Sequence, residues 1–433
     1  MKPLPTTVTT LEKIVGGGQA LGQFDDGRKL FAWGGLPGER VEVQLTKKKS
    51  HFVEGIVTHV EQPSPERIAP RDPGSYLSTS PWQIMDFAAE NRYKAALVEE
   101  AFELHDIVLP DPIAIYTDGK EYEYRNKVEY SFWFDTNENQ FDLAFFRRGT
   151  HGKIPIEKTS LARPEITGLS QEILRVLNAR HVEGRSLKTL LIRSDQAGQT
   201  AWQLYVKNED FPAKAIVDEV KSGSAICGEI IFSNPKSPAS VITKRLYASS
   251  QTVLSDTILG VSFRYATEGF FQINLPVYEQ ALKDMREWIE PGKPVLDLYS
   301  GVGTIGLTIG GDNVTLIEIN EHAVREMEQN ITALGREGSA KAVLAASENA
   351  LDHISKEACI ILDPPRAGLH EDVITKLLTE TPKRIVYLSC NPATQARDVM
   401  RLAEKYGIRA HQGYNFFPRT PHIEHLVVLD LKP

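Results

Sequence analysis

The stretch VLDLYSGVGTIGL at residues 295–307 decides the fold of the C-terminal part of this chain. Its apolar start predicts a buried strand, and its glycines follow where that strand passes into a helix. Glycines at such a turn let the backbone approach a ligand closely. Glu318 ends the next apolar run, where a carboxylate can accept hydrogen bonds from the hydroxyls of a ribose. We therefore expect a nucleotide-type ligand beside this turn.

The sequence around this stretch alternates between strands and helices from about residue 285 onward. Apolar runs such as VTLIEIN, ACIILDPP, RIVYLSCNP and HLVVLDL predict strands with helices between them, a pattern typical of a parallel, doubly wound sheet. A glycine motif of this kind fits both a dinucleotide-dependent oxidoreductase and a methyltransferase that uses S-adenosylmethionine. Asp297, placed before the glycines, favours S-adenosylmethionine, which needs no pyrophosphate cradle.

Two further strands end in polar motifs, Asp363-Pro-Pro-Arg and Ser389-Cys390-Asn-Pro. The carboxyl edge of such a sheet is where ligands bind. A thiol there, beside a methyl donor, suggests covalent catalysis, in which the thiol bonds to the substrate and activates an otherwise unreactive carbon. Addition of a thiolate to carbon 6 of a pyrimidine makes carbon 5 nucleophilic, and a base must then remove the carbon 5 proton. Glu424, just before the last strand, is the candidate base; the alternative is an exposed carboxylate at a strand start.

The state of the thiol matters, because a free cysteine is mostly protonated at neutral pH. The site should either lower the pKa of Cys390 or depend on deprotonation when the substrate is bound. Cys227 and Cys359 lie inside apolar runs, which predicts buried, inert thiols. With three separated cysteines, the chain has no disulfide framework and no cysteine-rich metal site to offer, so we expect no metal.

Composition fits a soluble protein of several domains. The 433 residues are 41% hydrophobic and 24% charged, with no apolar run long enough for a membrane span and no signal-peptide pattern at the start. We expect a cytoplasmic protein without a membrane partner. The net charge of −8 argues against coating nucleic acid through bulk charge, so any nucleic acid must be bound by local patches.

The N-terminal segment, about residues 10–60, alternates short apolar strands with glycine-rich turns. This pattern predicts a small five-stranded barrel of the OB type. Lys47–Lys49, followed by His51 and Phe52, would put cations beside an aromatic ring, which suits a nucleic-acid backbone. The pattern alone favours the alternative, a solvated hairpin end. After a proline-rich link and a long helical stretch, residues about 120–262 predict an α+β region rich in sheet.

Four motifs over the last 140 residues, DLYSGVGTIGL, LDPPRAGL, YLSCNPAT and FPRTPHIEH, closely resemble those of the RNA uracil-5 methyltransferases. The run FFQIN at 270–274 resembles the family's F-x-Q-x-N segment, and Arg125-Asn126-Lys127 its Y-R-N-K segment. The first sixty residues resemble the TRAM domain, an OB-like RNA-binding barrel. The resemblance therefore covers nearly the whole chain.

This resemblance implies a role for each matching residue. Cys390 is the expected nucleophile and Glu424 the expected proton acceptor. The residues expected to contact S-adenosylmethionine are Gln272, Tyr299, Glu318 and Asp363, with Asn349 as a secondary candidate. The residues expected to contact RNA are Lys47, Lys48, Lys49, Arg125 and Lys127.

The resemblance also implies an α/β fold in three parts. We expect a TRAM barrel at 1–66, a central α+β domain at 67–262 and a Rossmann-like, doubly wound methyltransferase domain at 263–433. Because the central domain is inserted in the family's fold, the helix near 88–107 is expected to pack on the catalytic domain. We expect a monomer.

The sequence departs from the family pattern at two places. Many TRAM-bearing members hold a 4Fe–4S cluster through four cysteines, whereas the corresponding stretches here, PRDPGSYLSTSPWQ and IEKTSLA, contain none, so we expect no iron–sulfur cluster. Asn415 stands where an acid is common, which puts any role for that acid in doubt.

The expected reaction is S-adenosylmethionine-dependent methylation of carbon 5 of a uridine in RNA. We favour 23S ribosomal RNA, because the TRAM barrel is typical of the ribosomal enzymes of this family. Uridine 54 of transfer RNA is the alternative target, and an RNA cytosine-5 methyltransferase would use the same thiol chemistry. Two hypotheses from other functional classes remain. One is a nucleotide-dependent oxidoreductase, and the other is an RNA-binding or RNA-folding protein.

Overall fold

The computed structural model describes residues 4–150, 152–220, 225–250 and 253–433. The chain divides into two compact units, and each unit is assembled from segments that are distant in sequence. Unit 1 comprises Met1–Tyr93, Lys120–Thr252 and Phe417–Pro421. Unit 2 comprises Lys94–Gly119, Val253–Phe416 and His422–Pro433.

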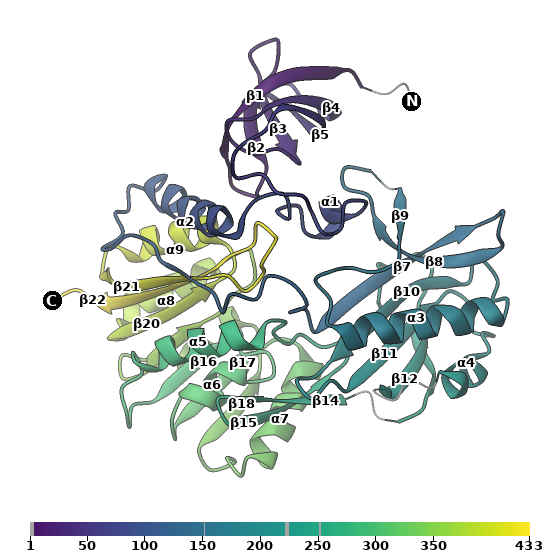
Figure 1. Cartoon of the computed structure of the whole chain (residues 1–433). Helices are drawn as coiled ribbons and strands as arrows, with labels where there is room; N and C mark the ends of the chain where they lie inside the picture. The colour runs from purple at the N-terminus through teal and green to yellow at the C-terminus, as the bar shows by residue number, and fades with distance from the viewer. Residues whose placement is uncertain (1–3, 151, 221–224, 251–252) are drawn as a thin grey trace. The chain divides into compact units, whose positions relative to one another are not determined.

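Unit 1 begins with a closed five-stranded barrel, which confirms the barrel predicted from the sequence (Figure 1). Its strands, in the order β1-β2-β3-β5-β4 around the barrel, are β1 (Thr6–Ile14), β2 (Ala20–Gln23), β3 (Lys29–Trp33), β4 (Arg40–Lys48) and β5 (Phe52–Gln62). Along β4, Val41, Val43 and Leu45 are buried and alternate with more exposed residues. This period of two is what a strand with one face on a core requires.

The rest of unit 1 is built on a seven-stranded sheet, in agreement with the predicted α+β region. Its strands, in the order β13-β12-β11-β10-β7-β8-β9, are β7 (Lys127–Asp135), β8 (Gln140–Phe146), β9 (Lys153–Ile156), β10 (Leu187–Ser194), β11 (Thr200–Val206), β12 (Ala225–Phe232) and β13 (Lys244–Ala248). The helices of this part are α1 (Tyr76–Thr79), α3 (Pro164–Ala179) and α4 (Ala213–Glu219). Figure 1 shows α3 lying across the strands, and its buried residues share one apolar core with the sheet. The sequence analysis did not anticipate α3.

Unit 2 contains a mixed eight-stranded sheet in the order β18-β17-β16-β19-β20-β22-β21-β6. Its strands are β6 (Ile115–Tyr116), β16 (Val295–Leu298), β17 (Val314–Glu318), β18 (Ala340–Leu344), β19 (Cys359–Leu362), β20 (Arg384–Ser389), β21 (Tyr406–Tyr414) and β22 (Glu424–Leu431). Strands β16 to β20 run parallel, as predicted, and a separate hairpin of β14 (Val253–Ile258) and β15 (Val261–Ala266) precedes them.

Helices cover both faces of this sheet, as a doubly wound fold requires. They are α2 (Phe87–Glu103), α5 (Leu275–Arg286), α6 (Thr304–Ile309), α7 (Glu321–Ala333), α8 (Glu371–Glu380) and α9 (Pro392–Leu402), with the short 3₁₀ turns η1 (Ser347–Asn349) and η2 (Leu351–His353). On one face, residues of α2, α8 and α9 share a core with Ile317. On the other face, Gly306 of α6 lies close to Val314 and Leu316.

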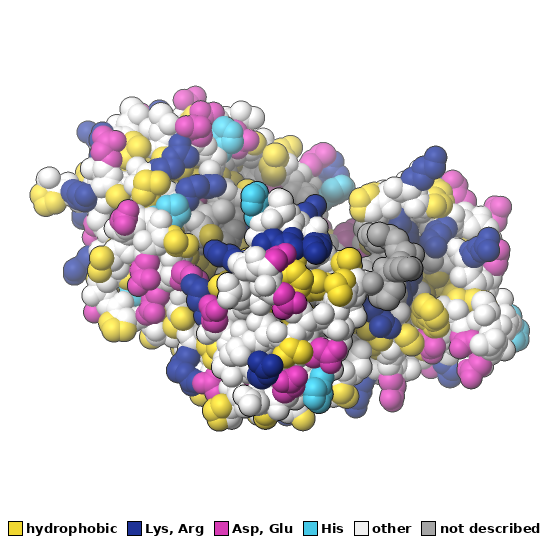
Figure 2. Space-filling model, turned by 90° about the horizontal axis from the view of Figure 1, so that it is seen from above, with side chains coloured by type: hydrophobic (Ala, Val, Ile, Leu, Met, Phe, Trp, Pro, Cys, Tyr) yellow, Lys and Arg dark blue, Asp and Glu magenta, His cyan; other side chains and the backbone are white. Residues whose placement is uncertain are grey.

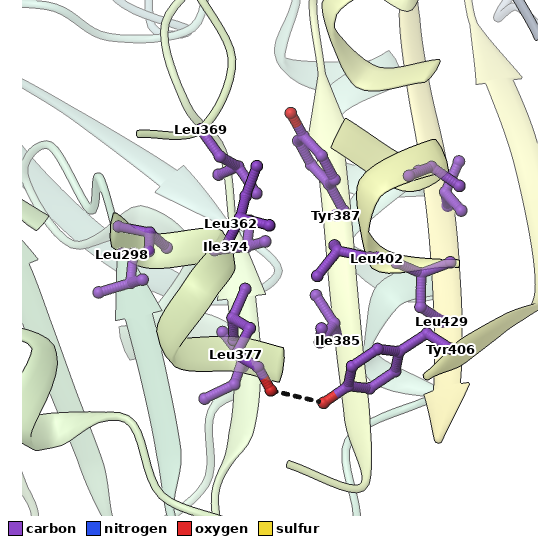
Figure 3. Close-up of a cluster of buried hydrophobic side chains, with 14 of the residues drawn as sticks. Leu298, Leu362, Leu369, Ile374, Leu377, Ile385, Tyr387, Leu402, Tyr406 and Leu429 are labelled. Atoms are coloured by element: carbon purple, nitrogen blue, oxygen red, sulfur yellow. Dashed lines mark hydrogen bonds between the residues drawn. The ribbon is translucent and has the colours of Figure 1, made fainter. Parts of the chain in front are cut away.

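Figure 3 shows the core on the α8 side of the sheet, where Ile374 and Leu377 point at strand residues such as Leu298 and Leu362. The hydroxyl of Tyr406 donates a hydrogen bond to the carbonyl of Leu377 at 3.3 Å. This packing holds β16, β19 and β20 side by side, so their carboxyl ends reach the same edge. None of the helices in the described ranges combines the length and the apolar composition needed to cross a membrane.

The last strands of the sheet depart from the simple alternation that the sequence suggested. Strand β22 runs antiparallel to β20, and β21, which the sequence analysis did not identify, pairs antiparallel with β22. The strand β21 reads YGIRAHQGY, and its burial pattern shows no clean alternation that would mark it as a strand. The short β6 joins from more than 280 residues earlier in the chain, at Gly413 and Tyr414.

Candidate active site at the carboxyl edge of the sheet

The register of the parallel strands aligns three of the predicted site residues. Leu298 pairs with Ile317 on one side and with Leu362 on the other. The same register, continued by one residue, places Tyr299 between Glu318 and Asp363. Because the chain leaves β16 toward β17 and later returns to β19 on the opposite side, this row lies at the switch point of the sheet, where ligands bind in open α/β folds.

Glu318 is tied to the glycine turn that follows β16. One carboxylate oxygen accepts from the backbone N–H of Gly301 at 3.0 Å, and the other from the N–H of Asn320 at 2.7 Å. Since a carboxylate offers about four acceptor positions, each oxygen keeps capacity for a further donor. Gly301 has a φ of 58°, and a Cβ there would meet no atom within 4 Å. The turn therefore leaves open space beside a fixed carboxylate.

Asp297 supports this turn from inside. Its side chain is fully buried, and Oδ2 accepts from the N–H of Gly306 at 2.9 Å. Its Oδ1 is buried without a hydrogen-bond partner among the described residues. Burial raises the pKa of Asp297 to about 8, although the Gly306 N–H opposes this rise. Asp297 thus holds the turn in place.

Cys390 and Glu424 face each other across the antiparallel pair β20 and β22. Ser389 pairs with His425 at the end of these strands, so the same register continued by one residue sets Cys390 opposite Glu424. Residues opposed in this way have Cα atoms about 4.5–5.5 Å apart. Cys390 is partly exposed and Glu424 is buried. The sequence therefore brings the predicted nucleophile and the predicted base together through strand pairing.

The pKa values of these groups follow from their shared, poorly solvated position. Burial raises the pKa of Cys390 to about 11, the charges of Glu424 and Asp363 add to the rise, and Arg366 opposes it. Burial and the charge of Asp363 hold the pKa of Glu424 well above its usual range. Burial also raises the pKa of Asp363 to about 7. Of the two routes expected for the thiol, a lowered pKa is therefore wrong for the free protein, because burial and neighbouring carboxylates favour the protonated form.

Arg366 and His422 are site residues that the sequence analysis did not single out. Nη2 of Arg366 lies 3.0 Å from Nδ1 of His422, two residues before Glu424. The carbonyl of Arg366 accepts from Nδ2 of Asn391 at 2.9 Å and from the hydroxyl of Thr394 at 3.2 Å. The loop after β19 is thereby tied to the residues that follow Cys390. The sequence signal that could have identified Arg366 was its position as the one cation of the Asp-Pro-Pro-Arg motif.

The structure places the remaining predicted ligand contacts in unit 2. Tyr299 has a φ of 67°; burial raises the pKa of its hydroxyl, and Ser347, the first residue of the turn that ends at Asn349, opposes this rise. Asn349 itself is exposed. Gln272 is half-buried in the segment between β15 and α5, and its contact with a ligand stays a prediction.

The predicted RNA contacts all lie in unit 1. Lys47, Lys48 and Lys49 are exposed at the hairpin between β4 and β5, where Nζ of Lys47 lies 5.6 Å from the ring centre of Phe52 and 2.8 Å from Glu54. Arg125 and Lys127 are half-buried at the start of β7. Figure 2 shows basic side chains interspersed with acidic ones over the face in view.

Asn415, where the family commonly has an acid, has a partner inside unit 2. Nζ of Lys94 lies 2.5 Å from its Oδ1, and both side chains are completely buried. Within the part of the chain that the structure describes, no three His, Cys, Asp or Glu side chains are grouped as metal ligands.

Comparison with known proteins agrees with this geometry. A family model described as tRNA (Uracil-5-)-methyltransferase matches residues 92–432. An uncharacterised RNA methyltransferase of Lactobacillus johnsonii is 28% identical, with 94% of each chain covered. Another from Bacteroides thetaiotaomicron is 29% identical, covering 96% of this chain and 99% of the relative.

Among solved structures, the tRNA (uracil-54, C5)-methyltransferase of Pyrococcus abyssi, in complex with S-adenosyl-L-homocysteine, superposes with a TM-score of 0.77. The match covers 98% of this chain and 100% of that one at 20% identity, which establishes the fold.

Proposed function

This chain belongs to the tRNA (uracil-5-)-methyltransferase family and is an RNA (uracil-5-)-methyltransferase, and we propose that it methylates carbon 5 of a uridine in 23S ribosomal RNA through a covalent bond from Cys390. The observation that carries the mechanism is the strand register that sets Cys390 opposite Glu424. That pairing joins a nucleophile and a base at one ligand-binding edge.

We propose S-adenosylmethionine as the methyl donor; when bound, it supplies an electrophilic methyl group. The residues at the glycine turn fit it, because both oxygens of Glu318 are held by backbone N–H groups and keep acceptor capacity for two ribose hydroxyls. Tyr299, Asp363, Gln272 and, secondarily, Asn349 complete the proposed set. The archaeal structure with S-adenosyl-L-homocysteine, which shares this fold, supports the assignment.

Cys390 opens the reaction by adding its sulfur to carbon 6 of the uracil. Because the pKa of this thiol is raised to about 11, sulfur passes its proton to water as the carbon–sulfur bond forms. Arg366, whose charge opposes the rise, favours the developing anion. Carbon 5 then carries the electron density needed to accept the methyl group.

Glu424 closes the reaction by taking the proton from carbon 5, which lets sulfur leave and restores the ring. The raised pKa favours the protonated carboxyl in the free protein, so Glu424 must lose its own proton before this step; the carboxylate it then forms is a stronger base than an exposed one. Burial therefore prepares Glu424 for this step.

We propose that RNA is bound by the barrel at 1–66 and the central region at 67–262, through Lys47, Lys48, Lys49, Arg125 and Lys127, and that residues 263–433 carry out methyl transfer. The barrel motivates ribosomal RNA as the target. Uridine 54 of transfer RNA is a second candidate, favoured by the whole-chain fold match to the archaeal transfer-RNA enzyme. A base inside folded RNA must be turned out of its stack, so both targets should be loop uridines.

The test incubates the protein with labelled S-adenosylmethionine and, separately, 23S ribosomal RNA and transfer RNA, and digests the products to nucleosides. We expect 5-methyluridine from the wild type and none from Cys390→Ala. Cys227→Ala, which alters a buried thiol of unit 1, is the matched control and should retain activity. Methylation by Cys390→Ala would contradict the mechanism, and 5-methylcytidine would contradict the choice of base.

Glu424→Gln tests the last step separately. This variant should form a covalent protein–RNA adduct that survives denaturation, because the carbon 5 proton stays in place after methyl transfer. Full product formation without adduct would remove Glu424 from the role of base.

A further inference from the structure

The segment Phe417–Pro421 belongs to unit 1, although β21 before it and β22 after it belong to unit 2. Its last residue, Pro421, lies three positions before Glu424, the first residue of β22. The two intervening residues are themselves held: Ile423 is buried in the core of unit 2, and His422 contacts Arg366. Because these two residues have little freedom to absorb a shift, a displacement of Pro421 would also displace Glu424.

Arg419 anchors this segment within unit 1. Its backbone N–H lies 3.0 Å from each carboxylate oxygen of Glu90, and its guanidinium donates to the carbonyl of Met85 at 2.6 Å and to Glu121. Both Arg419 and Glu90 are almost completely buried. The rings of Phe87 and Tyr122 each lie 5.3 Å from the guanidinium carbon.

The backbone at Arg419 is held in an uncommon conformation. Its φ is 66°, in the left-handed region that residues with a Cβ rarely occupy. Its carbonyl accepts from the N–H of Trp82 at 3.2 Å, and the preceding carbonyl, of Pro418, accepts from the hydroxyl of Tyr124 at 2.9 Å. Strained conformations of this kind persist where surrounding contacts fix them, often beside functional sites.

The barrel supports the other end of the segment. The turn between β1 and β2 contains Gly18, whose φ is +91°. A Cβ on Gly18 would lie 2.1 Å from Cβ of Pro421, so the backbone of Gly18 lies against the proline ring with no room for a side chain. The carbonyl of Gly18 also accepts from Nε1 of Trp82 at 3.0 Å.

We propose that Phe417–Pro421 is a positioning element for Glu424, and that Arg419 and Gly18 act on the reaction through it as positioning residues. The inference rests on the proposed function of Glu424. A buried arginine–glutamate pair is weak evidence for stability by itself, whereas it fixes geometry well. Because a misplacement of about 1 Å at a reacting group costs on the order of 100-fold in rate, a held segment this close to the base affects proton removal.

The test compares Gly18→Ala with Gly17→Ala. Gly17 has a φ of +92° and no atom within 4 Å of an added Cβ, so both changes impose the same backbone strain, and only Gly18→Ala presses on Pro421. In single turnover, we expect Gly18→Ala to release product at least 10-fold more slowly than Gly17→Ala and to accumulate denaturation-resistant RNA adduct. Binding of S-adenosylhomocysteine should be the same in both variants.

A second pair of variants tests the same segment by removing a positive charge. Arg419→Gln should also accumulate adduct. By contrast, Arg67→Gln, which breaks the ion pair of the half-buried Arg67 with the buried Glu39 in unit 1, should not. Arg419→Lys, which keeps the charge, should recover part of the product rate.

The wild type and Glu424→Gln serve as reference proteins. They separate a failure of the proposed function from a failure of the positioning role. If the wild type formed no 5-methyluridine, or if Glu424→Gln formed no covalent adduct, the proposed function would be overturned. With the references as expected, equal product rates and adduct levels in Gly18→Ala and Gly17→Ala would overturn the positioning role. Loss of adduct and product together in Gly18→Ala would also overturn it, because the defect would then precede proton removal.

Discussion

The raised pKa of Cys390 predicts slow exchange of this thiol with a small aromatic disulfide in the free enzyme. At a pKa of about 11, roughly one thiol in a thousand is ionised at pH 8, against about one in four for an ordinary cysteine of pKa about 8.5. This difference alone slows exchange roughly 200-fold. A more basic thiolate is intrinsically more nucleophilic, which recovers about tenfold. We therefore expect a rate roughly 20-fold below that of a reference thiol peptide.

The assay follows the modified Cys390 peptide by mass spectrometry between pH 7 and pH 10, where the rate should rise about tenfold per pH unit. Arg366→Gln removes a cation that lowers the pKa of Cys390, so it should slow exchange further at each pH. Arg401→Gln, which breaks a salt bridge with Glu371, is the control and should not. A plateau below about pH 9, or exchange as fast as the reference peptide at pH 8, would refute the argument from burial and charge.

Three further predictions concern binding and stability. Glu318→Gln should weaken S-adenosylhomocysteine binding roughly 10-fold or more in calorimetry, because charge-assisted hydrogen bonds are lost; the exposed Glu321→Gln is the control. Asp297 keeps its proton to about pH 8 only when folded, so the free energy of unfolding of the wild type should fall between pH 4 and pH 8. Asp297→Asn should lose this component, at most about 1.4 kcal/mol per pH unit in urea unfolding, and identical slopes would contradict the shift. Leu377→Ala, fully buried, should cost about 2–5 kcal/mol in the same measurement, and a change under 1 kcal/mol would contradict the tight packing of Figure 3.

Sequence reasoning succeeded where local pattern determines position. Apolar runs that stop at Glu318, Asp363 and Cys390 mark the ends of three strands. Because strands that alternate with helices form a parallel sheet, these ends lie at the same edge of the sheet. The glycine-rich turns and period-two strands of the N-terminal segment likewise predicted the barrel.

Sequence reasoning fell short where distant segments meet. The pairing of β6 with β21 depends on residues almost 300 positions apart, which no local periodicity encodes. The same holds for the contacts of Arg419 with Glu90 and of Gly18 with Pro421. The raised pKa of Cys390 was also out of reach, because it depends on the burial and neighbours that the folded chain supplies.

The contact between Glu90 and Arg419 also sets an order of events during synthesis. The two residues are separated by 329 positions, so a ribosome adding about 5–20 residues per second makes Arg419 on the order of tens of seconds after Glu90. Until then the carboxylate of Glu90 lacks the arginine it holds in the finished protein. The barrel and the central sheet can form while the chain is still growing, but the segment that leads to Glu424 can dock only after Arg419 has been made. The proposed base, Glu424, therefore reaches its place only after the residues of the barrel and the central sheet have been made.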